Sequence, residues 1–109
     1  MKMRLGIKTL SDMANISDDV LKHVLRRHRD FARILGVESV EELRRVIADV
    51  VEIPDEVYVD LFDIKYFLKK INELYVNVIV VNDTVKTAYL IGSKTYHRLR
   101  ERKWVRRPY

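Results

Sequence analysis

Residues 74–92 read LYVNVIVVNDTVKTAYLIG, and this stretch decides the fold. β-Branched and aromatic residues dominate both sides of Asn82-Asp83-Thr84, whose residue types favour tight turns. The pattern predicts two antiparallel strands joined by that turn. Val76, Val78 and Val80 fall on one side of the first strand, so we expect that side, with Ala88 and Leu90 of the second strand, to face a core.

The other side of this hairpin has a different chemical character. It carries Tyr75, Asn77, Thr87 and Tyr89. Aromatic rings and hydrogen-bonding groups of this kind stack on and bind unpaired RNA bases. For any one of these residues an ordinary solvent face of a small sheet is favoured, and an exposed face that serves as a site is the alternative.

Further strands extend the predicted sheet. Residues 57–59, Val-Tyr-Val, read as a short strand. Residues 63–73 are ambiguous, because the spacing of their apolar residues also fits a helix. A strand is favoured, since it gives the hairpin the third partner that a stable sheet needs.

Two amphipathic helices are predicted before the sheet. The first runs from Ser17, a good N-cap, to Leu35, and Gly36 supplies the stop. The second begins at Ser39, where a Ser-Val-Glu-Glu capping box opens a helical apolar pattern, and ends before Pro54.

The expected architecture is a single α+β domain over residues 1–109. Two N-terminal amphipathic helices pack on a small three- to four-stranded antiparallel sheet, and a short basic C-terminal helix or tail follows. Residues 1–16 form an N-terminal arm, residues 17–92 the core and residues 93–109 the tail, with a short helix over 93–103 and an extended end over 104–109.

Composition excludes several classes of protein. The 109 residues are 48% apolar and 34% charged, as expected of one globular domain. Cysteine is absent, which rules out disulfides, thiolate catalysis, zinc ribbons and iron–sulfur clusters. Only three glycines are present and none forms a phosphate-binding loop, so we expect no nucleotide cofactor. Glutamine is also absent while Lys, Arg and Glu are abundant, a bias typical of thermophile proteins.

No apolar run is long enough to span a bilayer and no signal core opens the chain, which predicts a cytoplasmic protein without a membrane partner.

The charge of the chain differs between its segments. Residues 1–36 hold eight Lys/Arg and four Asp/Glu, residues 37–83 hold five and eleven, and residues 84–109 hold eight and one. Folding the two cationic ends to one side would make a face that binds nucleic acid, our leading partner class.

Several segments between residues 20 and 92 together resemble one family. They are His23 and Arg27-His28 in the first helix, the Ile53-Pro54-Asp55 break, Lys69-Lys70-Ile71, and strand 76–81 with Val85-Lys86-Thr87-Ala88-Tyr89. With helix, helix and antiparallel sheet in this order, the chain resembles the barnase–EndoU–colicin–RelE group of small ribonucleases and toxins, in the branch found in phage and mobile elements. It departs from the barnase pattern in lacking a distinct His-Glu catalytic pair.

That resemblance implies metal-independent cleavage of RNA through attack by the 2′-hydroxyl. Such chemistry needs an acid, a base and cations that stabilise the phosphate. His97, inside the basic tail, is the first choice for acid/base, and His28 is the second, although it fits a core histidine equally well. Thr87 would orient the phosphate and Lys69 would stabilise its charge.

The expected binding residues are the cations of the first helix and of the tail, together with Tyr89. They are Arg26, Arg27, Tyr89, Arg98, Arg100, Arg102, Lys103, Arg106 and Arg107. RNA is preferred over DNA, and an antitoxin or a second copy of the chain are the protein partners left open. A small viral or plasmid regulator that binds nucleic acid without chemistry is the alternative function.

No metal is expected. His23 and His28 are five residues apart, about 140° around a helix, and do not converge on one ion. Four carboxylates in the acidic middle match no metal-binding loop. They are Asp55, Glu56, Asp60 and Asp63.

Overall fold

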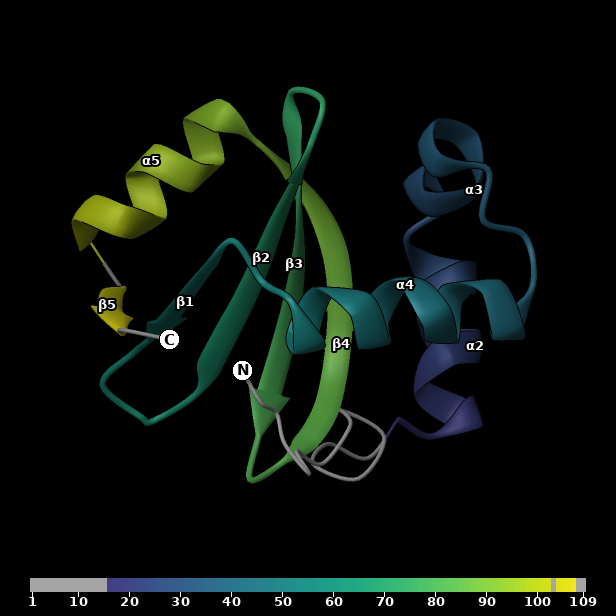
Figure 1. Ribbon diagram of the computed structural model, residues 1–109, viewed down its shortest axis with the longest axis horizontal. Helices are drawn as coiled ribbons and strands as arrows, with labels where there is room; N and C mark the ends of the chain where they lie inside the picture. Colours follow the sequence, from purple (N-terminus) through teal and green to yellow (C-terminus); the bar gives the residue numbers. More distant parts are fainter. Residues whose placement is uncertain (1–15, 103, 108–109) are drawn as a thin grey trace.

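The computed structural model describes residues 16–102 and 104–107, so the predicted arm lies outside the described residues except for Ile16. Three helices precede four strands, and a helix and a short strand follow (Figure 1). The elements are α2 (Asp18–Arg27), α3 (Asp30–Leu35), α4 (Val40–Glu52), β1 (Glu56–Val59), β2 (Lys65–Ile71), β3 (Leu74–Val81), β4 (Thr84–Gly92), α5 (Ser93–Arg102) and β5 (Val105–Arg107). The α+β class is confirmed.

The predicted helix starts are confirmed in detail. The Ser17 hydroxyl accepts a hydrogen bond from the Val20 amide at 3.2 Å and caps α2. At α4, Ser39 accepts from the Glu42 amide while the Glu42 carboxylate accepts from the Ser39 amide, a complete capping box. Each device pairs amides that the first helical turn leaves without partners.

The prediction of one helix over residues 17–35 is wrong, because the chain leaves the helical conformation at His28. His28 has φ −120° and ψ 71°, although its amide still donates to the Val24 carbonyl. After this break α3 begins anew and buries Phe31 completely. An apolar stripe that runs through His28 gives no sign of the break.

All five strands form one antiparallel sheet in the order β4-β3-β2-β1-β5. The strand predicted within residues 63–73 is confirmed as β2. The hairpin is confirmed too, and positive φ angles at Asn82 and Asp83 form its turn, as type I′ turns require. The sheet has five strands where three or four were predicted, because residues 105–107 of the tail also pair with β1.

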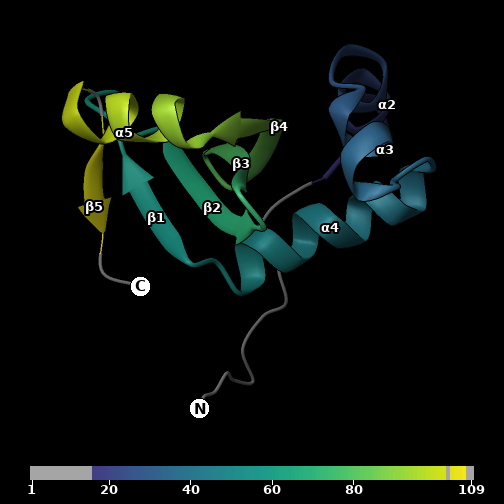
Figure 2. The same ribbon diagram turned by 90° about the horizontal axis from the view of Figure 1, so that it is seen from above.

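The first face of the sheet joins one buried cluster with α2, α3 and α4. From the strands it takes Val57, Phe67, Val76, Val78, Val80, Val85 and Ala88, and from the helices Leu21, Val24, Phe31, Leu43, Ile47, Val50 and Val51. Figure 2 shows α4 below this face and α5 on the opposite side. These burials remove apolar surface from water and are the main stabilising contribution.

The second face is not the open surface that the sequence predicted. α5, the predicted basic helix, lies over part of it, and Tyr96 and Trp104 pack there on Tyr58 and Tyr66. Tyr75 stacks on Tyr96 with ring centroids 4.1 Å apart. Alternation along a strand identifies the residues of one face, but it carries no information about what covers them.

Candidate functional site

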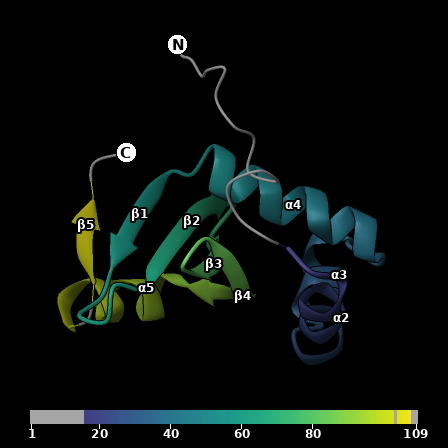
Figure 3. The ribbon, with the colours of Figure 1, turned by 90° about the horizontal axis from the view of Figure 1, so that it is seen from below.

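The β3–β4 portion of the second face lies between two basic helices. α5 contacts β3 and β4, and α2 contacts β4. Figures 2 and 3 show α5 over one side of the sheet, α4 on the other side, and α2 beyond the β4 edge. Five polar or aromatic side chains gather in this region, which we call the β3–β4 patch: His23, His28, Asn77, Thr87 and Tyr89.

A bulge in β4 turns Thr87 toward this patch. Thr87 pairs with Ile79 whereas Val85 pairs with Val80, which leaves Lys86 as an extra residue in β4. Without it, Val85 and Thr87 would share a face. With it, Val85 is buried in the first core while Thr87 shares the second face with Tyr89.

Two polar groups of the patch are buried, the Asn77 amide and the Thr87 hydroxyl. Asn77 is fully buried, and its amide makes no hydrogen bond of ordinary geometry but interacts with the Tyr89 side chain. Thr87 Oγ1 is buried and unpaired. An unpaired buried group costs about 1–3 kcal/mol relative to a hydrogen-bonded one. Asn77 lies opposite Tyr89 across the β3–β4 pair. Buried polar groups that lack ordinary hydrogen bonds are a reason to look for a ligand.

His28 reaches the patch from the break between α2 and α3. Its ring centroid lies 5.5 Å from that of Tyr89 and 6.3 Å from that of His23. Burial lowers the pKa of His28, the His23 and Arg27 charges lower that pKa further, and Asp30 opposes them. His28 is therefore neutral near pH 7, the form in which imidazole accepts a proton. Burial raises the pKa of Tyr89, so its phenol keeps its proton.

The other predicted catalytic residues lie apart from this patch. Lys69 is on the first face of the sheet, where its Nζ donates to the Ile53 carbonyl at 2.8 Å. His97 is exposed on α5 beside the Tyr96 ring, and no hydrogen bond or ring contact joins it to His28 or Thr87 among residues 16–102. The structure thus brings His28 and Thr87 to one face but not the whole predicted set.

The predicted binding cations fall into two main groups. Arg26 and Arg27 are exposed in the last turn of α2. On α5, Arg98, Arg100 and Arg102 are exposed, and the Arg100 guanidinium lies 5.6 Å from the Tyr96 ring centroid. Arg106 and Arg107 are part of β5, and Lys103 lies outside the described residues.

A second polar cluster, not expected from the sequence, holds α5 to the sheet. Glu56 Oε1 accepts hydrogen bonds from the Tyr58 hydroxyl at 2.5 Å and from the Tyr96 hydroxyl at 2.6 Å. Burial, reinforced by the Glu56 carboxylate, raises the pKa of both phenols. Both rings are almost wholly buried, so this cluster links β1 to α5 and presents little reactive surface.

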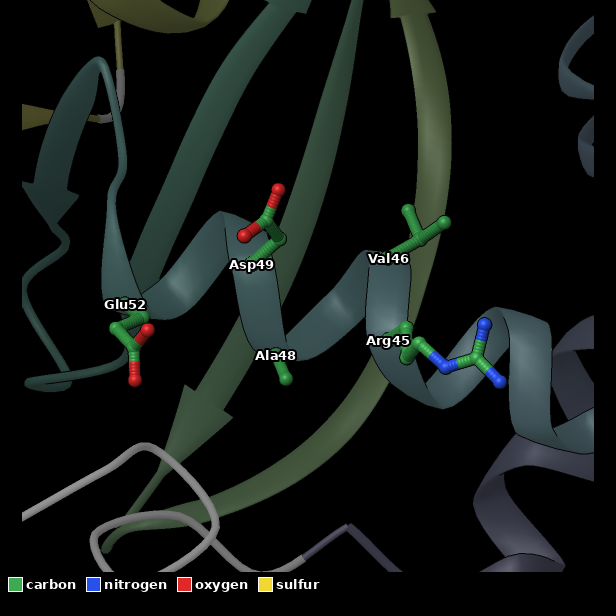
Figure 4. A pocket seen from close by; sticks show the side chains of 5 residues that line it. All are labelled: Arg45, Val46, Ala48, Asp49 and Glu52. Atoms are coloured by element: carbon green, nitrogen blue, oxygen red, sulfur yellow. The ribbon is translucent and has the colours of Figure 1, made fainter.

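A shallow hollow of about 400 Å³ lies along α4 (Figure 4). It is lined by Arg45, Val46, Ala48, Asp49 and Glu52. None of these side chains belongs to the β3–β4 patch, and α4 lies on the other side of the sheet.

In the part of the chain that the structure describes, no three His, Asp or Glu side chains cluster as metal ligands would. Over the same residues, no helix has the length and apolar character required to cross a membrane.

Comparisons with known proteins give no match: no family model, no curated protein and no solved structure is significantly similar to this chain. The chemistry of the site therefore has to be argued from its own residues.

Two members of the patch lacked a decisive signal in the sequence. His23 reads as an exposed charged-face residue, while Asn77 was visible as one amide in the apolar strand LYVNVIVV.

Proposed function

We propose that this protein is a metal-independent endoribonuclease whose reaction takes place at the β3–β4 patch. The observation that carries the proposal is the His28 imidazole, whose pKa is lowered by burial, packed on Tyr89 near the buried Asn77 amide and the buried, unpaired Thr87 hydroxyl. The resemblance to the barnase–EndoU–colicin–RelE group supports the same reaction. RNA is the substrate because the attacking group is its 2′-hydroxyl.

In the proposed reaction, His28 accepts the 2′-hydroxyl proton while the 2′-oxygen attacks the adjacent phosphorus. The bond from phosphorus to the 5′-oxygen breaks, and His23 in its protonated form supplies a proton to that leaving oxygen. The products are a 2′,3′-cyclic phosphate and a 5′-hydroxyl. Arg27, exposed at the end of α2, offsets the developing charge of the phosphate, and the buried Asn77 and Thr87 act as positioning residues for Tyr89.

Substrate binding in this proposal uses the two flanking helices. Cations at the end of α2 and along α5 attract the phosphate backbone, while Tyr89 offers an aromatic ring at the patch. The acidic α4 lies on the opposite side of the sheet, where it does not repel a bound strand (Figure 3).

The test is incubation of purified protein with a structured RNA in EDTA, followed by sequencing of the fragment ends. We expect ends with 2′,3′-cyclic phosphate, and a loss of about 10²- to 10⁴-fold in rate for His28→Ala and for His23→Ala. Thr87→Val removes only the hydroxyl and should also slow cleavage. Arg45→Ala, on α4, is the matched control.

Two results would contradict this assignment. Activity that survives His28→Ala but is lost in His97→Ala would move the chemistry to α5. If the protein binds RNA without cleaving it and salt releases the RNA, the protein is not an endoribonuclease. That second result would leave a nucleic-acid-binding module, the other candidate function, which the exposed cations Arg98 and Arg102 of α5 support.

A further inference from the structure

The loop between β1 and β2 exposes two large apolar side chains. Leu61 is 93% exposed and Phe62 is 83% exposed. Single exposed apolar residues are common, but an adjacent pair with almost no burial is a candidate contact for a partner. Neither side chain belongs to either buried cluster.

The loop that carries them is held in place by a buried carboxylate. Asp60 Oδ1 accepts hydrogen bonds from the Phe62 amide at 2.8 Å and from the Ile64 amide at 3.1 Å. Asp60 Oδ2 accepts from the Tyr66 hydroxyl at 2.7 Å. Asp63, with φ 63°, completes the turn by donating its amide to the Asp60 carbonyl. Because the backbone is already fixed in this way, the loop loses little conformational entropy when Phe62 binds a partner.

The loop lies next to the basic C-terminal end of α5. Val59, which precedes the loop, pairs with Val105 of β5, and Trp104 packs on Tyr66, which follows it. Figure 1 shows β5 between the end of α5 and the β1–β2 connection. Exposed Arg98 and Arg102 of α5 thus accompany an exposed aromatic ring.

We propose that Phe62, supported by Leu61, stacks on an unpaired base of an RNA strand whose phosphates run along α5. This inference rests on the proposed action on RNA and names its substrate class as single-stranded RNA. A ring and neighbouring cations are the two components of sequence-tolerant single-strand binding. The strand would continue from β2 to β4, about 10 Å at two strand spacings, and several nucleotides cover that distance.

The charge of the loop favours a base over other occupants. Asp63, next to Phe62, is exposed and repels a membrane of anionic headgroups, whereas a base is uncharged and the phosphates of its strand lie along α5. Two side chains also bury far less area than a stable protein dimer needs. An unpaired base carries no negative charge and needs only the small contact area that these two side chains offer.

The test measures binding of a 10-nucleotide RNA containing 2-aminopurine, with the full chain carrying His28→Ala to prevent cleavage. We expect quenching of 2-aminopurine, and about 5- to 100-fold weaker binding when Phe62→Ala is added. Phe62→Trp, in a Trp104→Phe background, should keep affinity and report stacking by its own quenching. Ile53→Ala, an exposed apolar residue away from α5, is the matched control.

Three outcomes would overturn this inference while leaving action on RNA intact. In the first, Phe62→Ala leaves the affinity for single-stranded RNA unchanged. In the second, Phe62→Ala lowers the affinity for duplex RNA as much as the affinity for single-stranded RNA. In the third, RNA binding does not depend on Phe62, while phosphatidylserine vesicles or a second copy of the chain bind through Phe62. If the chain with Phe62 binds no RNA at any salt concentration, the proposed function fails, and this inference fails with it.

Discussion

His28 shows how one residue couples fold to chemistry. It ends α2, and the same departure from the helix places its ring on Tyr89. Sequence reasoning identified His28 as either a core residue or a catalytic one, and Thr87 as a partner. It did not identify the bulge at Lys86, because nothing in the alternation of β4 marks an inserted residue.

The first prediction at the residue scale concerns pH. Because burial and neighbouring positive charge lower the pKa of His28, its midpoint in an NMR titration should lie below 6.5. Cleavage should therefore rise with pH through that midpoint, as His28 becomes neutral. Since the folded pKa is below the unfolded one, the stability from neutral His28 is present above 6.5 and is lost as pH falls through the folded pKa.

Two substitutions test the physical cause of that pKa. His23→Asn removes a positive neighbour and should raise the His28 midpoint, whereas Asp30→Asn removes a negative one and should lower it further. Shifts of the same sign in both variants would show that these charges do not act on His28.

At the scale of elements, the residues of β2 also fitted a helix, and the β3–β4 hairpin was the most predictable part. Its alternation and turn residues are local signals, and the structure confirms them. β5 was not predictable, because three residues of a basic tail show no strand pattern before β1 supplies a partner. The covering of the second face by α5 also depends on contacts between distant residues.

The attachment of α5 gives a prediction at this scale. Tyr96→Phe removes the hydrogen bond to Glu56 while keeping the buried ring, so unfolding in urea should show a loss of about 1–3 kcal/mol. Tyr75→Phe is the matched control, since Tyr75 stacks on the same ring and no hydrogen bond of its hydroxyl is observed among the described residues. Equal stability of the Tyr96 and Tyr75 variants would show that the Glu56 contact does not hold α5.

In the whole molecule, the charges that are separated along the sequence are also separated in space. The cationic α5 lies on one side of the sheet, α4, with four acidic and two basic residues, lies on the other, and α2, with Arg26 and Arg27 in its last turn, stands beyond the β4 edge (Figure 3). The charge blocks are readable in the sequence. Their placement is not, because it follows from which face each helix covers.

This placement predicts the salt dependence of RNA binding. Arg98→Ala combined with Arg102→Ala should weaken binding of single-stranded RNA and reduce the slope of log affinity against log salt by about 1.4, that is, about 0.7 for each lost phosphate contact. Arg45→Ala on α4 should leave the slope unchanged. A slope equally reduced by the α4 variant would indicate a diffuse charge effect rather than a path along α5.

The order β4-β3-β2-β1-β5 has a consequence for synthesis on the ribosome. Three hairpin contacts join strands that follow one another, so this part of the sheet can assemble as it emerges. The outer edge of β1 gains its partner only from residues 105–107, almost fifty positions later. Until then its unpaired amides and carbonyls stay open to other chains, and α5 lacks the strand that anchors its far end. A nascent chain is therefore most prone to aggregate in the interval between completion of β4 and docking of β5.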